Sequence, residues 1–195
     1  MGKDQTTTAA DLSVVRTGER NQAPVSMTTA PGGFLPSRED WPVFIAMAQN
    51  LAKTPFGENL GGEAGIVSIM FYARELGVPP MTAVMGGFSN VRGHLEMSAR
   101  LINTRIRELG HRVQVKELNP QKCTLHFQRI DTKEEGDVTY TIDMAHAAGL
   151  VKEGGNWKKH PEDMLFARAI TRLGRRHIPE AVGMAYAQGE ILETF

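Results

Sequence analysis

Residues 112–142 read RVQVKELNPQKCTLHFQRIDTKEEGDVTYTI, and this stretch decides the fold. Apolar and polar side chains alternate through three of its segments, which is the period of β-strands with one buried face. The apolar positions are Val113 and Val115, then Cys123, Leu125 and Phe127, then Val138, Tyr140 and Ile142. Asn119-Pro120 and the stretch 131–136 supply the turns. The segment predicts a three-stranded antiparallel sheet whose apolar face is covered by helices.

The segments before and after this predicted sheet have apolar residues at helical spacing. Helices are predicted from Asp40 with Pro42 in the first turn, between Gly62 and Gly77, at 98–109, at 143–148, and from Pro161 to about Arg176. Residues 82–97 predict a hairpin that turns at Asn90–Gly93, with Gly86-Gly87 as a strand bend. The expected fold class is α+β: an antiparallel three-stranded sheet plus a hairpin, covered by helices.

Length and composition predict one domain after an extended arm. The 195 residues suffice for a single hydrophobic core. Residues 1–36 are rich in Thr, Ala, Gly and Pro without apolar periodicity, so they are predicted to be a disordered N-terminal arm, and 37–195 to be one core domain. The chain has no run of about 18 apolar residues and no secretory pattern. With Cys123 as its single cysteine, it is expected to be cytoplasmic, without membrane partners.

Charge is balanced over the chain but concentrated in two basic segments. The 22 basic and 22 acidic residues give a net charge of zero. Residues 98–116 and 158–177 each carry +4, so the remainder carries −8. A chain polarised in this way can present a cationic groove to nucleic acid. The hypothesis is that both segments meet in space and form one continuous channel for an unpaired polynucleotide.

The helix predicted from Pro161 carries its arginines opposite its apolar side. Arg168, Arg172 and Arg175 lie close enough to repel one another. A phosphate backbone would relieve this repulsion, and the planar guanidinium suits phosphate oxygens. A solvated face, or ion pairs with acids elsewhere in the chain, is the alternative explanation.

Two further groups of residues are candidates for contact with DNA. Arg100 and Arg107 share a face of the helix at 98–109, whereas Arg105 falls within the apolar arc and is expected to snorkel or pair. Trp157 stands before the cations Lys158 and Lys159. Its ring could stack on a base, and a core plug at a helix entrance is an equally open alternative.

Enzymatic patterns are poor in this sequence. The chain has no GxxxxGK[ST], no HExxH and no zinc-ligand spacing, so no cofactor or metal is expected and the protein is predicted not to be an enzyme. The remaining catalytic alternative is a metal-dependent nuclease that acts through Glu96 and Asp143, with Asp131 as a third candidate, although turn and cap roles explain the two aspartates better.

Four segments of the chain, at 73–80, 97–103, 123–130 and 157–170, resemble in this order the core of the RecT/Redβ family of phage annealing proteins. Residues 157–170, WKKHPEDMLFARAI, with Arg175 beyond them, resemble the closing segment of that core. Residues 73–80, ARELGVPP, look like its helix-ending element, and MSARLIN at 97–103 is similar to its next helix. The following strand resembles 123–130. The resemblance spans roughly residues 60–190.

This resemblance implies ATP-independent binding of single-stranded DNA and annealing of complementary strands in phage-type homologous recombination. It implies a homo-oligomer, either a ring or a helical filament, that holds an annealed duplex intermediate and works beside a phage exonuclease and a host single-strand-binding protein. Arg168 and Arg175 would contact phosphates, and Trp157 would support the groove. A protective single-strand-binding protein without annealing activity is the alternative.

One departure from the family pattern lies just after His160-Pro161. Redβ has two basic residues there, and this chain has Glu162 and Asp163. Acids in a first helical turn suit the helix dipole but would repel a phosphate. No DNA contact is therefore expected at these two positions, and Lys158 and Lys159 are expected to supply the charge instead.

Overall fold

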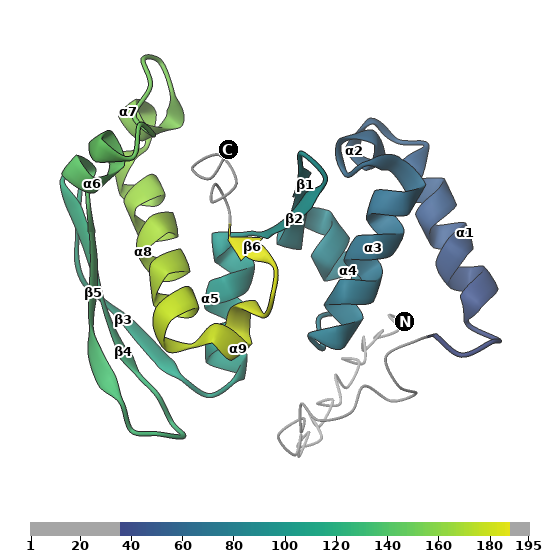
Figure 1. Cartoon of the computed structure of the whole chain (residues 1–195), viewed down its shortest axis with the longest axis horizontal. Coiled ribbons are helices and arrows are strands. Elements are labelled where there is room, and N and C mark those ends of the chain that lie inside the picture. The colour runs from purple at the N-terminus through teal and green to yellow at the C-terminus, as the bar shows by residue number, and fades with distance from the viewer. Residues whose placement is uncertain (1–35, 188–195) are drawn as a thin grey trace, which may run out of the picture.

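The computed structural model describes residues 36–187, so the predicted arm at 1–36 lies outside the described residues except for its last position. In chain order, the elements are α1 (Trp41–Ala52), α2 (Pro55–Asn59), α3 (Gly62–Glu75), α4 (Pro80–Thr82), the π-helical turn η1 (Ala83–Gly87), β1 (Phe88–Val91), β2 (His94–Met97), α5 (Ala99–Glu108), β3 (Arg112–Asn119), β4 (Lys122–Gln128), β5 (Glu135–Thr141), α6 (Ile142–Ala147), α7 (Asn156–Lys159), α8 (Pro161–His177), α9 (Pro179–Val182) and β6 (Tyr186–Ala187). The β3–β5 sheet and α8 lie at one end of the long axis, α1 to α4 lie at the other, and α5 lies between them (Figure 1).

The larger sheet confirms the predicted alternation in β4 and β5, whereas Val113 is the one buried residue of β3 and Ile142 begins α6 instead of ending the third strand. Its order is β3-β4-β5, all antiparallel, and the burial of β4 alternates residue by residue. Cys123, Leu125 and Phe127 turn inward, and α8 packs on this face. Burial raises the pKa of the Cys123 thiol to about 11. A bulge between Val115 and Glu117 interrupts β3, and Val115 is half exposed at this edge of the sheet.

The predicted hairpin is the start of a second, small sheet. β1 and β2 pair antiparallel from Phe88↔Met97 to Val91↔His94, and β6 joins β2 in parallel. Asn90 accepts a hydrogen bond from the Gly93 backbone N–H across the turn at 3.0 Å, and its amide donates to Leu60 O at 3.2 Å. The hairpin is therefore fixed both by its own turn and by the end of α2.

Close packing of α5 against α8 joins the two halves of the molecule. A Cβ added at Gly174 would lie 2.9 Å from methyl carbons of both Ile102 and Val182. Real side chains do not approach so closely, so the approach of the two helices requires a glycine here. Ser98 caps α5 by accepting from the Leu101 backbone N–H at 3.3 Å.

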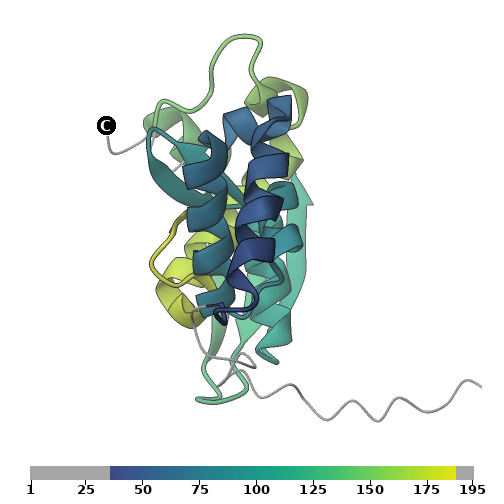
Figure 2. The ribbon, with the colours of Figure 1, turned by 90° about the vertical axis from the view of Figure 1, so that its right-hand side faces the viewer.

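Helices α1 and α3 lie side by side on the far side of the hairpin from the larger sheet (Figures 1 and 2). Trp41, Phe44 and Phe71 form an aromatic cluster at their contact, with ring centroids 5.1 to 6.4 Å apart. Asp40 is the N-cap residue, as expected, although its carboxylate accepts a hydrogen bond from the Ser37 hydroxyl instead of capping the helix.

The fold class expected from sequence is confirmed at the level of α+β, a three-stranded antiparallel sheet and a hairpin with helices. The bend expected at Gly86-Gly87 is wrong, because these residues belong to a π-helical turn in which Gly86 has a φ of +104°. Helices α2, α4, α7 and α9 and strand β6 were not predicted, since none exceeds five residues and periodicity needs a longer window. None of the helices described between residues 36 and 187 is both long enough and apolar enough to span a bilayer.

Candidate nucleic-acid interface

A groove of about 620 Å³ lies between the β1–β2 hairpin, the segment 148–157 and α8, and we call it the hairpin groove. Its lining residues come from all three parts. They are Ser89, Val91, Arg92, Glu96, Ala148, Gly149, Leu150, Lys152, Gly155, Asn156, Trp157, Met164, Ala167 and Arg168. The wall therefore mixes apolar side chains with charged ones.

Secondary-structure periodicity explains which side chains face the hairpin groove. Ser89 pairs with Glu96 across the hairpin, and cross-strand partners project from the same face of a sheet. On α8, Met164 and Arg168 are four residues apart and lie on one side of the helix. Two rigid elements thus set the opposite walls, and their spacing is held by the packing of α5 on α8.

Three cations from separate parts of the sequence line the groove. Arg92 is exposed in the hairpin turn with a φ of +52°, Lys152 is exposed in the loop before α7, and Arg168 is half-buried on α8. Among the described residues that line the groove, Glu96 is the one acid, and it is only 3% exposed. Positive charge at the rim with low-dielectric walls favours an anionic ligand.

Trp157 belongs to the wall of the groove and not to its open surface. It is 6% exposed, and its ring lies 6.3 Å from that of Tyr140 on β5. A ring that is covered to this extent cannot offer a whole face to a base. The structure therefore supports the alternative to base stacking, in which Trp157 is part of the core. A supporting role for Trp157, which the family resemblance implies, is compatible with this position.

The two lysines after Trp157 are exposed on α7. The Lys158 ammonium pairs with the carboxylate of Glu153, and Lys159 is the next residue along the helix. Neither lines the hairpin groove. They follow two lining residues, Asn156 and Trp157, in the sequence.

The arginines of α8 do not act as one row. Arg168 lines the groove, whereas the Arg172 guanidinium lies 4.8 Å from the centre of the Tyr140 ring and its Nη1 contacts Met144 Sδ at 3.4 Å. Arg175 donates to Ala185 O at 2.7 Å, beside β6. The seven-residue spacing of Arg168 and Arg175 places both on the same side of α8, and Arg172 turns toward the larger sheet.

The arginines of α5 lie outside the hairpin groove. Arg100 and Arg107 are exposed, and Arg107 Nη2 donates to Val113 O at 3.1 Å. Ile102 and Gly174 mark the side of α5 that meets α8, and Arg100 projects about 200° around the helix from Ile102. The structure therefore does not bring the two basic segments together around this groove, and the cations that join Arg168 there are Arg92 and Lys152.

Arg105 was expected to snorkel or to form an ion pair, and it is instead buried with its guanidinium bonded to backbone carbonyls. It is 2% exposed, and its guanidinium donates to Ala181 O at 2.8 Å, to Leu76 O, and to Glu180 O at 3.5 Å. Desolvation lowers the pKa of this guanidinium. The residue ties α5 to the end of α3 and to α9.

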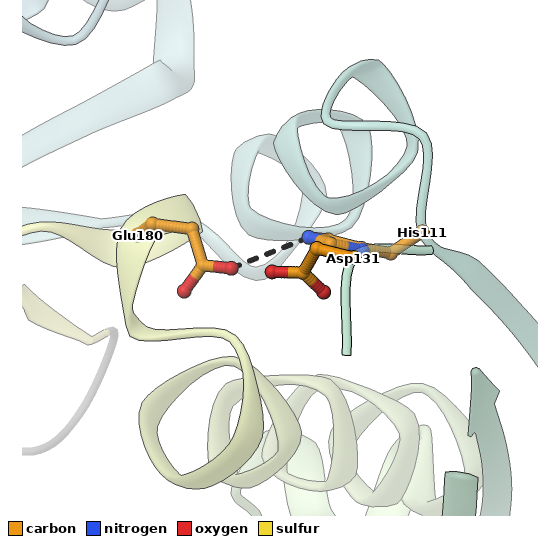
Figure 3. Close-up of side chains that lie close together, drawn as sticks. All are labelled: His111, Asp131 and Glu180. Atoms are coloured by element: carbon orange, nitrogen blue, oxygen red, sulfur yellow. Dashed lines mark ion pairs between the residues drawn. The ribbon is translucent and has the colours of Figure 1, made fainter. Parts of the chain in front are cut away.

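The carboxylates proposed for a nuclease are spread over the structure. Glu96 lines the hairpin groove, Asp143 is exposed on α6 and does not line it, and Asp131 lies after β4. Within residues 36–187, the single cluster of at least three metal-capable groups is His111, Asp131 and Glu180, whose ligand atoms all lie within 4.8 Å of one another (Figure 3). Of the three carboxylates proposed for a nuclease, this cluster contains only Asp131.

Arg129 already supplies the positive charge at this cluster. Its Nη2 lies 2.5 Å from Asp131 Oδ2 and 2.6 Å from Glu180 Oε1. His111 Nδ1 accepts the Ile130 backbone N–H at 3.2 Å, so in the neutral ring Nε2 carries the proton and faces Glu180 Oε1 at 3.3 Å. A protonated nitrogen is no metal ligand. The group is a clasp that ties α9 to the sheet, and we call it the Arg129 clasp.

The Arg129 clasp predicts an acid-dependent loss of stability. Its hydrogen bonds hold the pKa of Asp131 well below the usual range, so the stabilisation is present above the unfolded pKa of about 4 and is lost as the pH falls below it. In Arg129→Met, the deficit in unfolding free energy relative to the wild type should be greater near pH 7 than near pH 3 in urea titrations. A deficit that stays constant with pH would contradict this. Arg176→Met, which removes an exposed arginine of α8 outside the clasp, is the control.

Sequence reasoning missed two groove cations, Arg92 and Lys152. Each was visible as a cation beside a glycine turn, Arg92-Gly93 and Lys152 before Gly154. Their 60-residue separation gave no reason to place them together. Hairpin pairing and the loop before α7 bring them to one groove.

No family model, curated protein or solved structure matches the chain. The similarity of residues 157–170 to the RecT/Redβ proteins therefore stays a prediction made from the sequence. The structure itself shows a groove with cations at its rim and a largely apolar wall.

Proposed function

We propose that the protein binds single-stranded DNA in the hairpin groove and anneals complementary strands without ATP. The observation that carries this proposal is the convergence of Arg92, Lys152 and Arg168 around a wall that includes Val91 and Met164. Phosphates need the cations, and unstacked bases need an apolar surface. A duplex keeps the faces of its bases stacked inside, so the combination of cations and an apolar wall favours an unpaired strand.

The size of the groove bears on how binding would build up along a strand. Its volume of about 620 Å³ lies within the range of pockets that bury one small ligand, about 300–1,000 Å³. One protomer would then hold only a few nucleotides. A homo-oligomer, as a ring or a helical filament, would extend the groove and accumulate affinity along the strand.

Annealing rests on the resemblance to the RecT/Redβ family, whose core fold we propose for this chain. The step is electrostatic and geometric, because it needs only that phosphates are held while base edges remain open to a second strand. No nucleotide hydrolysis enters it. The exonuclease and host single-strand-binding protein that the resemblance implies remain proposed partners.

Mixing complementary labelled oligonucleotides without nucleotide tests this function. We expect the protein to accelerate pairing, and light scattering on the same samples to report assemblies larger than one chain. A merely protective coat would slow pairing. Pairing that is unchanged or slowed by saturating protein contradicts annealing, and loss of intact strands in magnesium or manganese would point to a nuclease instead.

A further inference from the structure

Glu96 has an unusual place for a carboxylate in a cationic groove. It lies on β2, the central strand of the small sheet, paired with Ser89 on one side and with Tyr186 on the other. Pairing on both sides fixes its backbone, and the side chain is 3% exposed while lining the groove. The Glu96 side chain is thus buried in the wall of the groove.

A buried carboxylate determines which chemical groups of a ligand can bind beside it. It repels phosphate and accepts hydrogen bonds, and its two oxygens offer about four acceptor positions, so a ligand donor can bind alongside a protein donor. In single-stranded DNA, the donors within reach of a groove wall are the N–H groups of the bases. The phosphates would therefore meet Arg92, Lys152 and Arg168 while a base edge turns toward Glu96.

We propose that Glu96 accepts a hydrogen bond from the exocyclic amino group of a base, and so makes the groove prefer amino-bearing bases to thymine or uracil. This inference rests on the proposed binding of single-stranded DNA. Cytosine N4 is a free donor and a known partner of Glu and Asp side chains. In uracil and thymine, a carbonyl oxygen replaces the amino group, and the remaining N–H lies between two carbonyls that oppose a carboxylate.

The contact is compatible with annealing. Each amino group of cytosine or adenine has two hydrogens, and Watson–Crick pairing uses one of them. The other remains on the major-groove edge, where side chains read it in duplex DNA. A strand held by Glu96 can therefore pair with its complement without first releasing the protein.

Deoxycytidine and deoxyuridine strands of equal length are the matched probes, because these bases differ only around C4. With strands of about 20 nucleotides, we expect the wild type to bind the cytosine strand roughly three- to ten-fold more tightly in fluorescence anisotropy, the net worth of one typical hydrogen bond. Glu96→Gln should bind both strands alike, since its amide can donate to O4 as well as accept. Glu162→Gln, at an exposed acid outside the groove, should keep the preference.

Each outcome of this comparison decides something. Equal affinity of the wild type for the two strands overturns the inference and leaves the proposed function standing. Failure of the wild type to bind either strand at low salt overturns the proposed function itself. A preference that survives in Glu96→Gln also overturns the role of Glu96. Should that variant fold poorly by circular dichroism, Glu96→Asp, which withdraws the carboxylate by one methylene, is expected to reduce the preference.

Discussion

Replacing Arg105 by methionine is expected to lower the free energy of unfolding by about 2–4 kcal/mol. Methionine fills the space of the aliphatic stem but leaves the carbonyls of Leu76 and Ala181 without their guanidinium donor. Each acceptor so abandoned costs about 1–3 kcal/mol, offset in part because a buried charge no longer has to be desolvated. Urea titration followed by circular dichroism measures the loss.

Arg100→Met is the matched control for Arg105, because it removes an exposed arginine from the same helix. It is expected to stay within about 0.5 kcal/mol of the wild type. If Arg105→Met were as stable as this control, the carbonyl contacts would contribute nothing to folding. The link that Arg105 makes between α5, α3 and α9 would then be a consequence of packing alone.

Neutralising the three groove cations together is expected to weaken DNA binding by roughly 100-fold near 0.1 M salt, if each cation neutralises one phosphate. The variant is Arg92→Asn, Lys152→Gln and Arg168→Gln, where asparagine suits the positive φ of position 92. Anisotropy with a labelled single strand gives the ratio of dissociation constants, and the loss should not depend on base sequence.

A control of equal charge separates the groove from net charge. Arg38, Lys53 and Arg176 are exposed and do not line the hairpin groove. Their triple replacement by glutamine removes the same +3 and should leave affinity within a few-fold of the wild type, since exposed charges beyond about 10 Å are largely screened. Equal losses in both triple variants would mean that binding follows overall charge and not this groove.

Local pattern was sufficient to predict most of the secondary structure. The alternation through 112–142 predicted the larger sheet because β4 and β5 each have one buried face. The helices predicted at 98–109 and from Pro161 to about Arg176 have boundaries that the structure reproduces within one or two residues. These signals act through neighbours in sequence, which is why they are readable without the fold.

The candidate site was less predictable, because it depends on distances that local pattern does not contain. Helical spacing put Arg168 and Arg172 on one broad side, yet Tyr140 draws Arg172 toward the larger sheet. Arg100 and Arg107 of α5, like the arginines of α8, lie opposite the apolar side of their helix, yet they do not line the groove. Glu96 was considered only as a metal ligand, since nothing in the sequence shows that β6 would pair beside it and hold it in a groove wall.

The central claim is that Arg92, Lys152 and Arg168 hold the phosphates of an unpaired strand. The salt dependence of the dissociation constant tests it most directly, because each phosphate neutralised on a single strand contributes a slope of about −0.7 to log K against log salt. The account predicts that the groove triple variant has a slope shallower than the wild type by about 2. Parallel lines for the two proteins, at whatever affinity, would contradict it.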